Sequence, residues 1–457
     1  MDCKFYFSSG NWTLRQPGHS TQTGRRNDVL IGAVADDITG ATDLCLMLSR
    51  EGMKTLQVIG VPEEGADFGD ADAVVVALKS RTIPAEEAVR ASTAAAGKLI
   101  AAGAEQLLFK YCSTFDSTDD GNIGPVADAL QDLTGGELTI ACPSFPATGR
   151  TVYKGHLFVG DRLLSESSLK DHPLTPMHDS DLVRVLQRQT RRPVGLIDWP
   201  VIARGEDAIR AAFAQQKAAG KRILVVDTLS DADLRTIGAA CDGMKLVTGG
   251  SGIAMGLPEN FRKRKKLPVR KAMTRMMAPA GRRVVLAGSC SLATRVQIEV
   301  ARNDAAALLR LDISAVADGS QSAADIADWV ISQDKDRLPL VYSSASPEEL
   351  QSIQAAMGRH ESGALVEQTL AEVAERLKQK GFTRFLIAGG ETSGAVINAL
   401  GVKTLSIGPE IDPGVPWTRS LSGPDIVLAL KSGNFGAPDF FLKAWAQLET
   451  EGSDARD

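Results

Sequence analysis

An apolar strand, a glycine-containing turn and an amphipathic helix recur in this order along most of the chain, starting near Asp28. Short, continuous apolar runs predict strands buried on both faces, and helices with apolar residues three and four positions apart would cover the sheet. This alternation is typical of an α/β fold with parallel strands. The expected strands of the first half are 29–35, 73–78, 106–110, 138–141, 194–197 and 222–226, and the expected helices are 41–51, 85–102, 125–133, 182–188 and 205–219.

The same alternation resumes in the second half of the chain. Its expected strands are 283–287, 338–343, 385–388 and 404–407. The intervening segment contains FRKRKKLPVRK and few aliphatic residues, which predicts an exposed basic linker whose cations face solvent or contact a phosphate. A chain of 457 residues is long enough for two or three domains. We therefore expect two α/β domains with mainly parallel sheets, with these boundaries: a loose extension over 1–27, a first domain over 28–257, the linker over 258–282 and a second domain over 283–450.

Charge and composition exclude several classes of protein. The chain has 51 Lys and Arg residues against 56 Asp and Glu residues, and this formal charge of −5 argues against a nucleic-acid partner. Apolar runs fall short of the roughly 18 residues that a membrane span needs, and the first 27 residues lack the apolar centre of a signal peptide, so we expect a cytoplasmic protein. His172 and His178 could bind a metal, although the prolines and acids around them favour a structural role.

The first expected strand ends in VADDITGATD, which places Asp36 and Asp37 at its carboxyl end and Thr39 at the start of the next helix. Ligands bind open α/β sheets at that edge. Adjacent carboxylates there could accept a proton from a substrate hydroxyl, hold a metal or bind sugar hydroxyls. Capping of the following helix is the alternative role of these residue types.

Polar residues also follow other strands. The loop FKYCSTFDSTDDGNIGP brings together Lys110, Ser113, Asp116 and Asn122, a density of short polar groups that favours a site for a polyol. Local turns would explain the same residues. Three further cations are natural anchors for an acidic substrate or are solvated surface residues: Lys79, Arg81 and Arg150.

In the second half, GSCS at 288–291 and GGETSG at 389–394 each follow a strand and precede a helix. Backbone N–H groups at such a helix start suit a phosphate, and Ser289, Thr392 and Ser393 add hydroxyl donors. Packing alone would also explain these glycines. The sequence contains neither a GxxxxGK[ST] loop nor a GxGxxG turn, so a nucleotide site here is of another kind.

Taken in order, these motifs resemble those of the four-carbon acid sugar kinases over residues 29–445. The resemblance rests on ADDITGATD, ALKSRT, FKYCSTFDST, GNIGPV, TGRTVYKGHLF, HPLTPMHDSDL, VTGGSG, GSCS, AGGETSG, GPEIDPGVPW and LKSGNFG. FKYCSTFDST, GNIGP and LKSGNFG favour the branch whose acid carries a ketone at carbon three over the D-threonate and D-erythronate kinases.

The resemblance implies an acid-sugar domain followed by a nucleotide domain, with the active site in a cleft between them. The implied reaction transfers the γ-phosphoryl group of ATP, with Mg²⁺, to the terminal hydroxyl of 3-dehydro-erythronate or 3-dehydro-threonate. Asp37 or Asp36 would orient or deprotonate this hydroxyl. The implied substrate-binding residues are Thr39, Lys79, Arg81, Lys110, Ser113, Asp116, Asn122 and Arg150, and the implied ATP-binding residues are Ser289, Gly389, Gly390, Glu391, Thr392, Ser393, Gly394 and Gly433.

Some alternatives stay open at the level of sequence. A non-catalytic sensor could bind an acid sugar and a nucleotide without turnover, although the paired carboxylates argue against it. The metal ligands are not assigned, and a homodimer is one of the possible assemblies.

Overall fold

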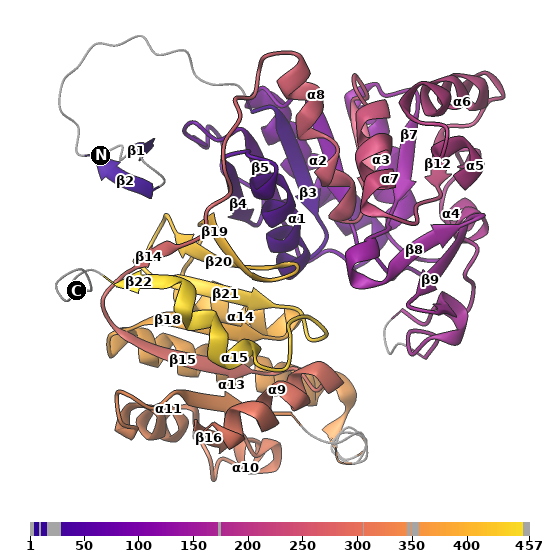
Figure 1. Cartoon of the computed structure of the whole chain (residues 1–457). Coiled ribbons are helices and arrows are strands. Elements are labelled where there is room, and N and C mark those ends of the chain that lie inside the picture. Colours follow the sequence, from indigo (N-terminus) through magenta and orange to yellow (C-terminus); the bar gives the residue numbers. More distant parts are fainter. Residues whose placement is uncertain are drawn as a thin grey trace. The chain divides into compact units, whose positions relative to one another are not determined.

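The computed structural model describes residues 4–8, 11–15, 29–171, 175–304, 306–344, 349, 355 and 357–450 (Figure 1). The chain divides into two compact units, residues 1–272 and 273–457, and each unit is described by itself. Strands β1 (Lys4–Ser8) and β2 (Asn11–Arg15) form an antiparallel pair within the segment expected to be a loose extension. Apolar residues at every second position in KFYFS and NWTLR are the period of a strand, a signal that our sequence analysis missed.

Unit 1 contains a parallel sheet. In its described part the strands lie in the order β11-β12-β7-β13-β6-β3-β5-β4. Their bounds are β3 (Ile31–Ala35), β4 (Thr55–Ile59), β5 (Ala73–Ala77), β6 (Gln106–Lys110), β7 (Thr139–Cys142), β11 (Val194–Ile197), β12 (Ile223–Val226) and β13 (Leu246–Gly249). The strands predicted for this half are confirmed, whereas β4 and β13 were missed because each mixes polar and apolar residues.

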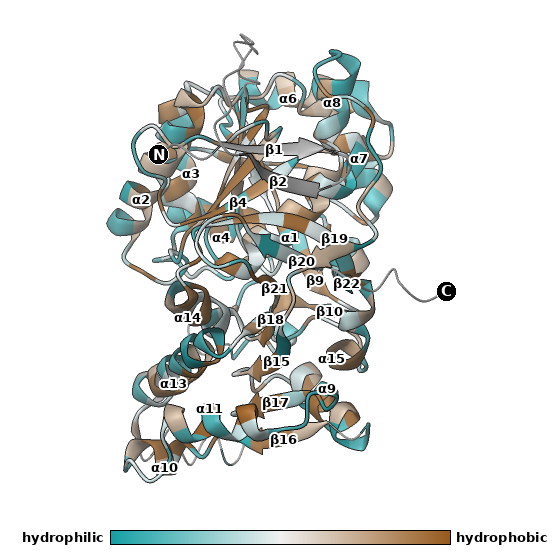
Figure 2. Ribbon diagram, turned by 90° about the vertical axis from the view of Figure 1, so that its left-hand side faces the viewer, coloured by the Kyte–Doolittle hydropathy of each residue, from teal (hydrophilic) through white to brown (hydrophobic). Residues whose placement is uncertain are grey.

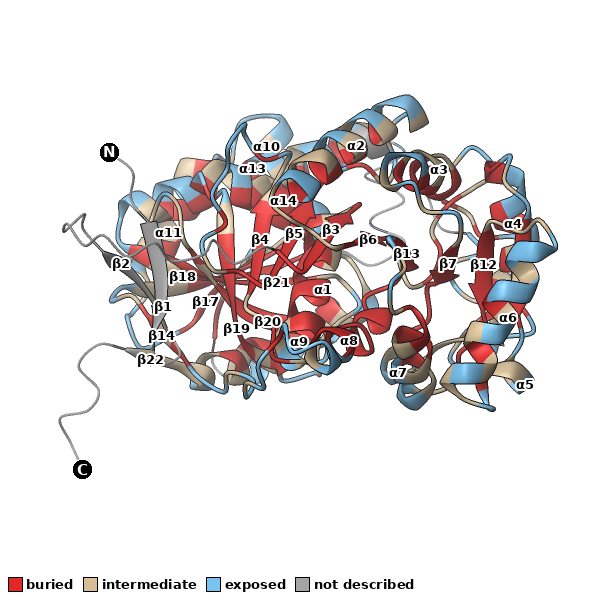
Figure 3. Ribbon diagram, turned by 90° about the horizontal axis from the view of Figure 1, so that it is seen from above, coloured by how far each residue is buried: buried red, intermediate tan, exposed pale blue. Residues whose placement is uncertain are grey.

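Helices cover this sheet with their apolar sides and face solvent with the other (Figure 3). In α2 (Ala85–Ala101) the buried residues recur three and four positions apart, as a helix on a sheet requires. The other helices are α1 (Ile38–Arg50), α3 (Ile123–Thr134), α4 (Leu182–Gln189), α5 (Trp199–Ile202), α6 (Glu206–Ala218), α7 (Asp231–Ala240) and α8 (Pro258–Lys263), with short helices η1 (Pro146–Thr148), η2 (Leu164–Glu166) and η3 (Gly252–Met255). A small antiparallel sheet follows β7 and comprises β8 (Arg150–Tyr153), β9 (His156–Val159) and β10 (Arg162–Leu163).

The basic segment 258–282 was expected to be an exposed linker, but its first part packs on unit 1. The segment begins with α8, whose Phe261 is buried. Its cations form ion pairs with carboxylates of the same unit. The pairs are Arg262 with Glu51, Arg264 with Asp242, Lys266 with Glu105 and Arg270 with Asp72. These cations neutralise acidic residues of the fold, which the charge run alone does not reveal.

Unit 2 contains a mixed sheet with the strand order β19-β20-β21-β18-β15-β17-β16 among its described residues. Strands β21 to β16 run parallel, and β19 and β20 add an antiparallel edge that the sequence analysis did not predict beyond residue 407. The bounds are β15 (Arg282–Ala287), β16 (Ala307–Arg310), β17 (Pro339–Tyr342), β18 (Phe382–Ala388), β19 (Thr404–Asp412), β20 (Val415–Ser420) and β21 (Val427–Lys431).

The helices of unit 2 place their hydrophilic residues outward, while strands such as β15 and β17 are hydrophobic (Figure 2). Trp417 is fully buried in the core of this unit, and its indole nitrogen donates to the Ala444 carbonyl at 2.7 Å. The remaining elements are α9 (Leu292–Asn303), α10 (Ile313–Ala317), α11 (Ala323–Ser332), α13 (Arg359–Gln379), α14 (Gly390–Leu400), α15 (Phe440–Lys443), η4 (Ala444–Gln447) and the parallel pair β14 (Met276–Ala278) and β22 (Leu448–Thr450). No helix in the described ranges is long and apolar enough to cross a membrane.

Candidate active site

The polar cluster of unit 1 lies at the carboxyl ends of three adjacent strands. Strand β3 pairs with β5 on one side and β6 on the other, so Ala35 lies beside both Ala77 and Lys110. Strands β4 and β5 lie on one side of β3, and β6 lies on the other. The order of the strands therefore reverses at β3, and open α/β sheets bind ligands at such a switch point. The residues that leave these three strand ends therefore converge, as the sequence predicted.

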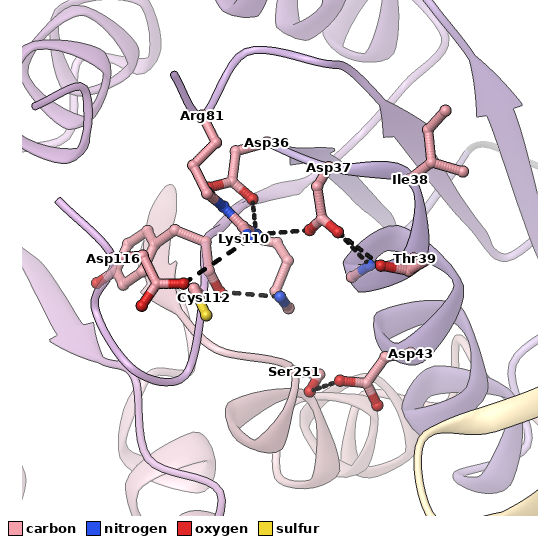
Figure 4. A network of polar contacts seen from close by, with 12 residues as sticks. Asp36, Asp37, Ile38, Thr39, Asp43, Arg81, Lys110, Cys112, Asp116 and Ser251 are labelled. Carbon is pink, nitrogen blue, oxygen red and sulfur yellow. Dashed lines mark hydrogen bonds and ion pairs between the residues drawn. The ribbon is translucent and has the colours of Figure 1, made fainter. Parts of the chain in front are cut away.

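Arg81 is the centre of this cluster (Figure 4). Its Nε and Nη2 donate to the two carboxylate oxygens of Asp36 at 2.9 and 2.8 Å, and Nη2 also donates to Asp37 Oδ1 at 2.7 Å. Asp116 Oδ2 lies 4.0 Å from Nη1. One guanidinium thus bridges two adjacent carboxylates and approaches a third, while a quarter of its side chain is still exposed.

Asp37 has the capping role as well as the contact with Arg81. It is the N-cap of α1, and its Oδ2 accepts from the Gly40 backbone N–H at 3.0 Å and the Thr39 hydroxyl at 2.8 Å. A side chain at Gly40 would overlap the Asp37 carboxylate and lie 2.9 Å from Lys110 Nζ. Glycine at this position therefore lets an ammonium group approach the first turn of α1.

The two neighbouring carboxyl groups differ in acidity. Burial raises the pKa of Asp36, although Arg81 opposes this shift. Burial acts in the same direction on Asp37, but Arg81, Lys110 and the hydrogen bonds from Gly40 and Thr39 outweigh it and lower its pKa. Asp37 is therefore a fixed anion at neutral pH, and Asp36 is the better proton acceptor of the pair. Separation of the acidities of two adjacent carboxyl groups is a common property of catalytic sites.

Asn122 has a supporting role in this structure, and its contact with a substrate stays a prediction. Its side-chain amide is buried and donates to three backbone carbonyls of the loop after β5, those of Ser80 at 2.6 Å, Ile83 at 2.9 Å and Arg81 at 3.2 Å. These bonds fix the loop that carries Arg81. The sequence showed a polar residue in the right loop, but not which backbone groups it satisfies.

The remaining predicted residues of unit 1 are Lys79, Ser113 and Arg150. Lys79 is exposed, and Ser113 is partly exposed in the loop after β6. Arg150 begins β8 and hydrogen-bonds the Thr148 carbonyl close to it in the chain. His172 lies outside the described residues, and the rest of the described chain contains no group of three or more ligand side chains that could hold a metal ion.

The sequence analysis gave no role to a second polar pair at this edge. Asp43, one turn further along α1, accepts a hydrogen bond from Ser251 in the VTGGSG loop after β13 (Figure 4). Ser251 follows a strand that we did not predict, which is why its proximity to α1 was missed.

Burial raises the pKa of Cys112 to about 12, so its thiol is not a nucleophile at neutral pH.

In unit 2, a pocket of about 290 Å³ lies at the carboxyl ends of parallel strands. It contains six of the eight residues predicted to bind a nucleotide. The lining residues are Gly288, Ser289, Cys290, Ile313, Ser343, Ser362, Gly363, Val366, Glu367, Gly389, Gly390, Glu391, Thr392 and Gly433. Ser393 and Gly394 are absent from this lining, since both are buried inside α14 and the Ser393 hydroxyl donates to the Gly389 carbonyl at 2.7 Å.

Glycines give this pocket its backbone walls. Gly389 has a φ of 126°, a conformation that other residues rarely adopt. A side chain at Gly433 would lie 2.5 Å from the Ser289 hydroxyl, so the turn after β21 packs directly on the turn after β15. The first turn of α14 begins in this lining without a side-chain cap, and the hydroxyl groups of Ser289 and Thr392 accompany it, a combination that fits phosphate groups. Four lining residues come from α13 and could not be assigned from the sequence, because no strand-end motif marks them.

Two family models cover most of the chain. A "Sugar-binding N-terminal domain" matches residues 31–257, and a "Nucleotide-binding C-terminal domain" matches residues 284–441. A Burkholderia multivorans protein called 3-oxo-tetronate kinase is 54% identical over 92% of this chain and 97% of its own length, and a Cupriavidus necator protein of the same name is 53% identical with the same coverage. The chain belongs to the four-carbon acid sugar kinase family. It is therefore an enzyme of the kinase class.

Two solved structures share the fold of this chain. A Salmonella typhimurium crystal structure is 42% identical, with a TM-score of 0.83 over 92% of this chain and 100% of the other. A Haemophilus influenzae protein is 41% identical, with a TM-score of 0.74 over 91% of this chain and 99% of the other. The α/β class with a mostly parallel sheet is confirmed.

Proposed function

We propose that this kinase transfers the γ-phosphoryl group of ATP to the terminal hydroxyl of a 3-oxo-tetronate and forms the 4-phosphate. The main support is that four relatives with 50–54% identity, each matched over 92% of this chain, are called 3-oxo-tetronate kinase. The carboxylate–arginine cluster of unit 1 and the glycine-walled pocket of unit 2 supply the two kinds of site that such a reaction needs.

Unit 1 would bind the acid. Phosphoryl transfer requires alignment and charge neutralisation more than covalent chemistry by the protein. Arg81 and Lys110 supply the cations for the substrate carboxylate, and Thr39 and Asp116 supply polar groups for its hydroxyls. Asp36, with its raised pKa, would accept the proton of the attacking hydroxyl, while Asp37 stays ionised and holds Arg81 and α1 in place.

Unit 2 would bind ATP. Ser289, Thr392 and the backbone N–H groups at Gly390 and Gly433 are the donors that fit its phosphates, while the Gly389 N–H donates to the Lys431 carbonyl. Mg²⁺ bound with ATP would neutralise part of the charge of the phosphates. The protein's own contribution is to orient the phosphate chain and keep its charge balanced, which also limits wasteful hydrolysis.

A coupled assay of ADP release tests this proposal. The purified chain is given 3-dehydro-erythronate, 3-dehydro-threonate, D-erythronate and D-threonate at equal concentrations, with MgATP. We expect the 3-oxo acids to have the highest kcat/KM, because a site built around one polar group can discriminate by several orders of magnitude. Faster turnover of D-threonate or D-erythronate would refute the substrate assignment, and binding of both ligands without ADP release would favour a sensor.

A further inference from the structure

Lys431, the last residue of β21, is a charged residue that the proposed function has not yet used. Its side chain is fully buried, and its ammonium donates to Thr294 Oγ1 at 3.1 Å, to the Ser432 carbonyl at 3.1 Å and to the Gly433 carbonyl at 2.8 Å. Within the described residues it forms no ion pair with a carboxylate. Neutral oxygens alone therefore hold this buried cation.

The three contacts converge on the turn that lines the pocket of unit 2. The Gly433 carbonyl also accepts from Ser291 Oγ at 2.6 Å and from Thr294 Oγ1 at 3.1 Å. A carbonyl oxygen has two lone pairs, so three donors around it leave its peptide little freedom. Lys431 and the first turn of α9 thus fix the orientation of the Gly433 turn, which lines the proposed phosphate site.

A buried ammonium without an anion is costly, because its hydration is lost and nothing of opposite charge replaces it. Thr294 and two carbonyls can also accept hydrogen bonds from a neutral amine, so the turn itself does not need a charge. Gly433 connects this cation directly to the pocket. The missing anion is therefore best supplied by a ligand of that pocket.

We propose that Lys431 is a positioning residue for the nucleotide, which holds the Gly433 turn and supplies the buried positive charge that the polyphosphate neutralises. This inference rests on the proposed nucleotide site. It adds Lys431 to that site and couples nucleotide binding to the protonation of Lys431. The hydrogen bonds around the Gly433 turn are the observation that supports it.

Nucleotide binding should then be linked to protonation of Lys431. Burial lowers the pKa of Lys431 to about 7 and is the only cause of the shift, so no titratable group of the neighbouring described segments contributes to it. Above pH 7 the free protein holds this side chain largely neutral. A bound polyanion favours the charged form, so binding at pH 7.5 takes up a proton.

Isothermal titration calorimetry with MgADP tests this coupling without turnover. Titrations at pH 7.5 in two buffers of different ionisation enthalpy give the number of protons taken up per nucleotide. We compare the wild type with Lys431→Met, which keeps the length and apolar stem of the side chain, and with Lys403→Met, which removes an exposed lysine of the same unit. We expect proton uptake by the wild type and Lys403→Met, none by Lys431→Met, and at least tenfold weaker binding by Lys431→Met.

A purely structural Lys431 would behave differently. In that case Lys431→Met would unfold at a lower temperature than the wild type, while the MgADP affinity and the proton uptake of its folded fraction would be unchanged. This result would overturn the inference while the proposed function stands. Should Lys431→Met not fold, the wild type still decides, because its proton uptake must increase between pH 6 and pH 8, and uptake near zero across this range would refute the coupling. A wild type that binds no adenine nucleotide would overturn the proposed function itself.

Discussion

Replacing Arg81 by methionine tests the electrostatic account of the unit 1 cluster. The change keeps an unbranched side chain and removes three charge-assisted hydrogen bonds, two to Asp36 and one to Asp37, with N–O distances of 2.7–2.9 Å. Two adjacent carboxylates then remain together in a largely buried site with Lys110 as the nearest cation. Removing one partner of a buried ion pair costs about 3–5 kcal/mol, and since a quarter of Arg81 is exposed we expect about 2–3 kcal/mol.

The loss should depend on pH with a definite sign. The pKa of Asp37 is lowered in the folded protein, so Asp37 stabilises the fold above its unfolded pKa of about 4 and this contribution is lost as the pH falls. This loss falls below about pH 4, so it does not separate pH 8 from pH 4.5. Without Arg81, protonation of Asp36, whose pKa is already raised by burial, relieves the repulsion between the two carboxylates as the pH falls toward 4.5. The difference in stability between variant and wild type is therefore larger at pH 8 than at pH 4.5.

Differential scanning calorimetry at pH 4.5, 6 and 8 measures this difference for the unit 1 transition. At pH 8 we expect the Tm of Arg81→Met to fall by about 5–10 °C, from about 2–4 °C per kcal/mol for a unit of this size. Arg90→Met, an exposed arginine on α2, is the matched control and should leave Tm unchanged. An equal loss at all three pH values, or no recovery of stability on adding Asp36→Asn to Arg81→Met, would refute the reasoning.

Three further predictions concern catalysis and the second unit. Asp36→Asn should lower kcat by about 10²–10⁴-fold with little change in either KM, because general-base catalysis contributes about that much. Steady-state kinetics with both substrates varied measure this effect. An unchanged kcat would mean that another group accepts the proton. Gly433→Ala places a methyl group 2.5 Å from the Ser289 hydroxyl, so we expect KM for ATP to rise while KM for the acid is retained, and an equal rise in both would contradict separate sites. The pKa of Lys431 is about 7 in the folded protein and about 10.5 in the unfolded chain, so the folded state binds fewer protons between these values. The free energy of unfolding of the wild type should therefore increase from pH 7 to pH 10 relative to that of Lys431→Met. The same pH dependence of this free energy in both proteins would argue against a buried ammonium.

The cluster in unit 1 could be predicted because the rule that governs it is topological. Parallel strands align their carboxyl ends, so Asp36, Arg81 and Lys110 each follow a recognisable apolar run and must meet at one edge of the sheet. The same logic located most of the pocket in unit 2, where Ser289 and Gly389 follow β15 and β18.

What could not be predicted depends on which partner a polar group finds. Asn122 was assigned to the substrate, yet its amide satisfies the backbone around Arg81, and no local pattern distinguishes the two roles. The sequence analysis gave Lys431 no role, because a lysine at a strand end is usually solvated, and only the structure shows that it is buried and donates to Thr294 of α9. Strands β20 and β21 were missed because VPWTRS carries a proline and an arginine, and their antiparallel pairing lacks the helix that marks a parallel crossover.

A comparison of two lysines connects the charge of each site with the charge of its ligand. Lys110 and Lys431 are both the last residue of a strand, both are buried, and both donate to the carbonyl of the following residue. Lys110 has the carboxylates of Asp36 and Asp37 within electrostatic reach, so the protein itself supplies much of the negative charge in unit 1. Lys431 has no such partner in the described chain, and under our proposal a nucleotide in the unit 2 pocket supplies the negative charge that favours its charged form. Unit 1 is thereby suited to a singly charged acid and unit 2 to a polyanion, which is the pairing that phosphoryl transfer from ATP to an acid sugar requires.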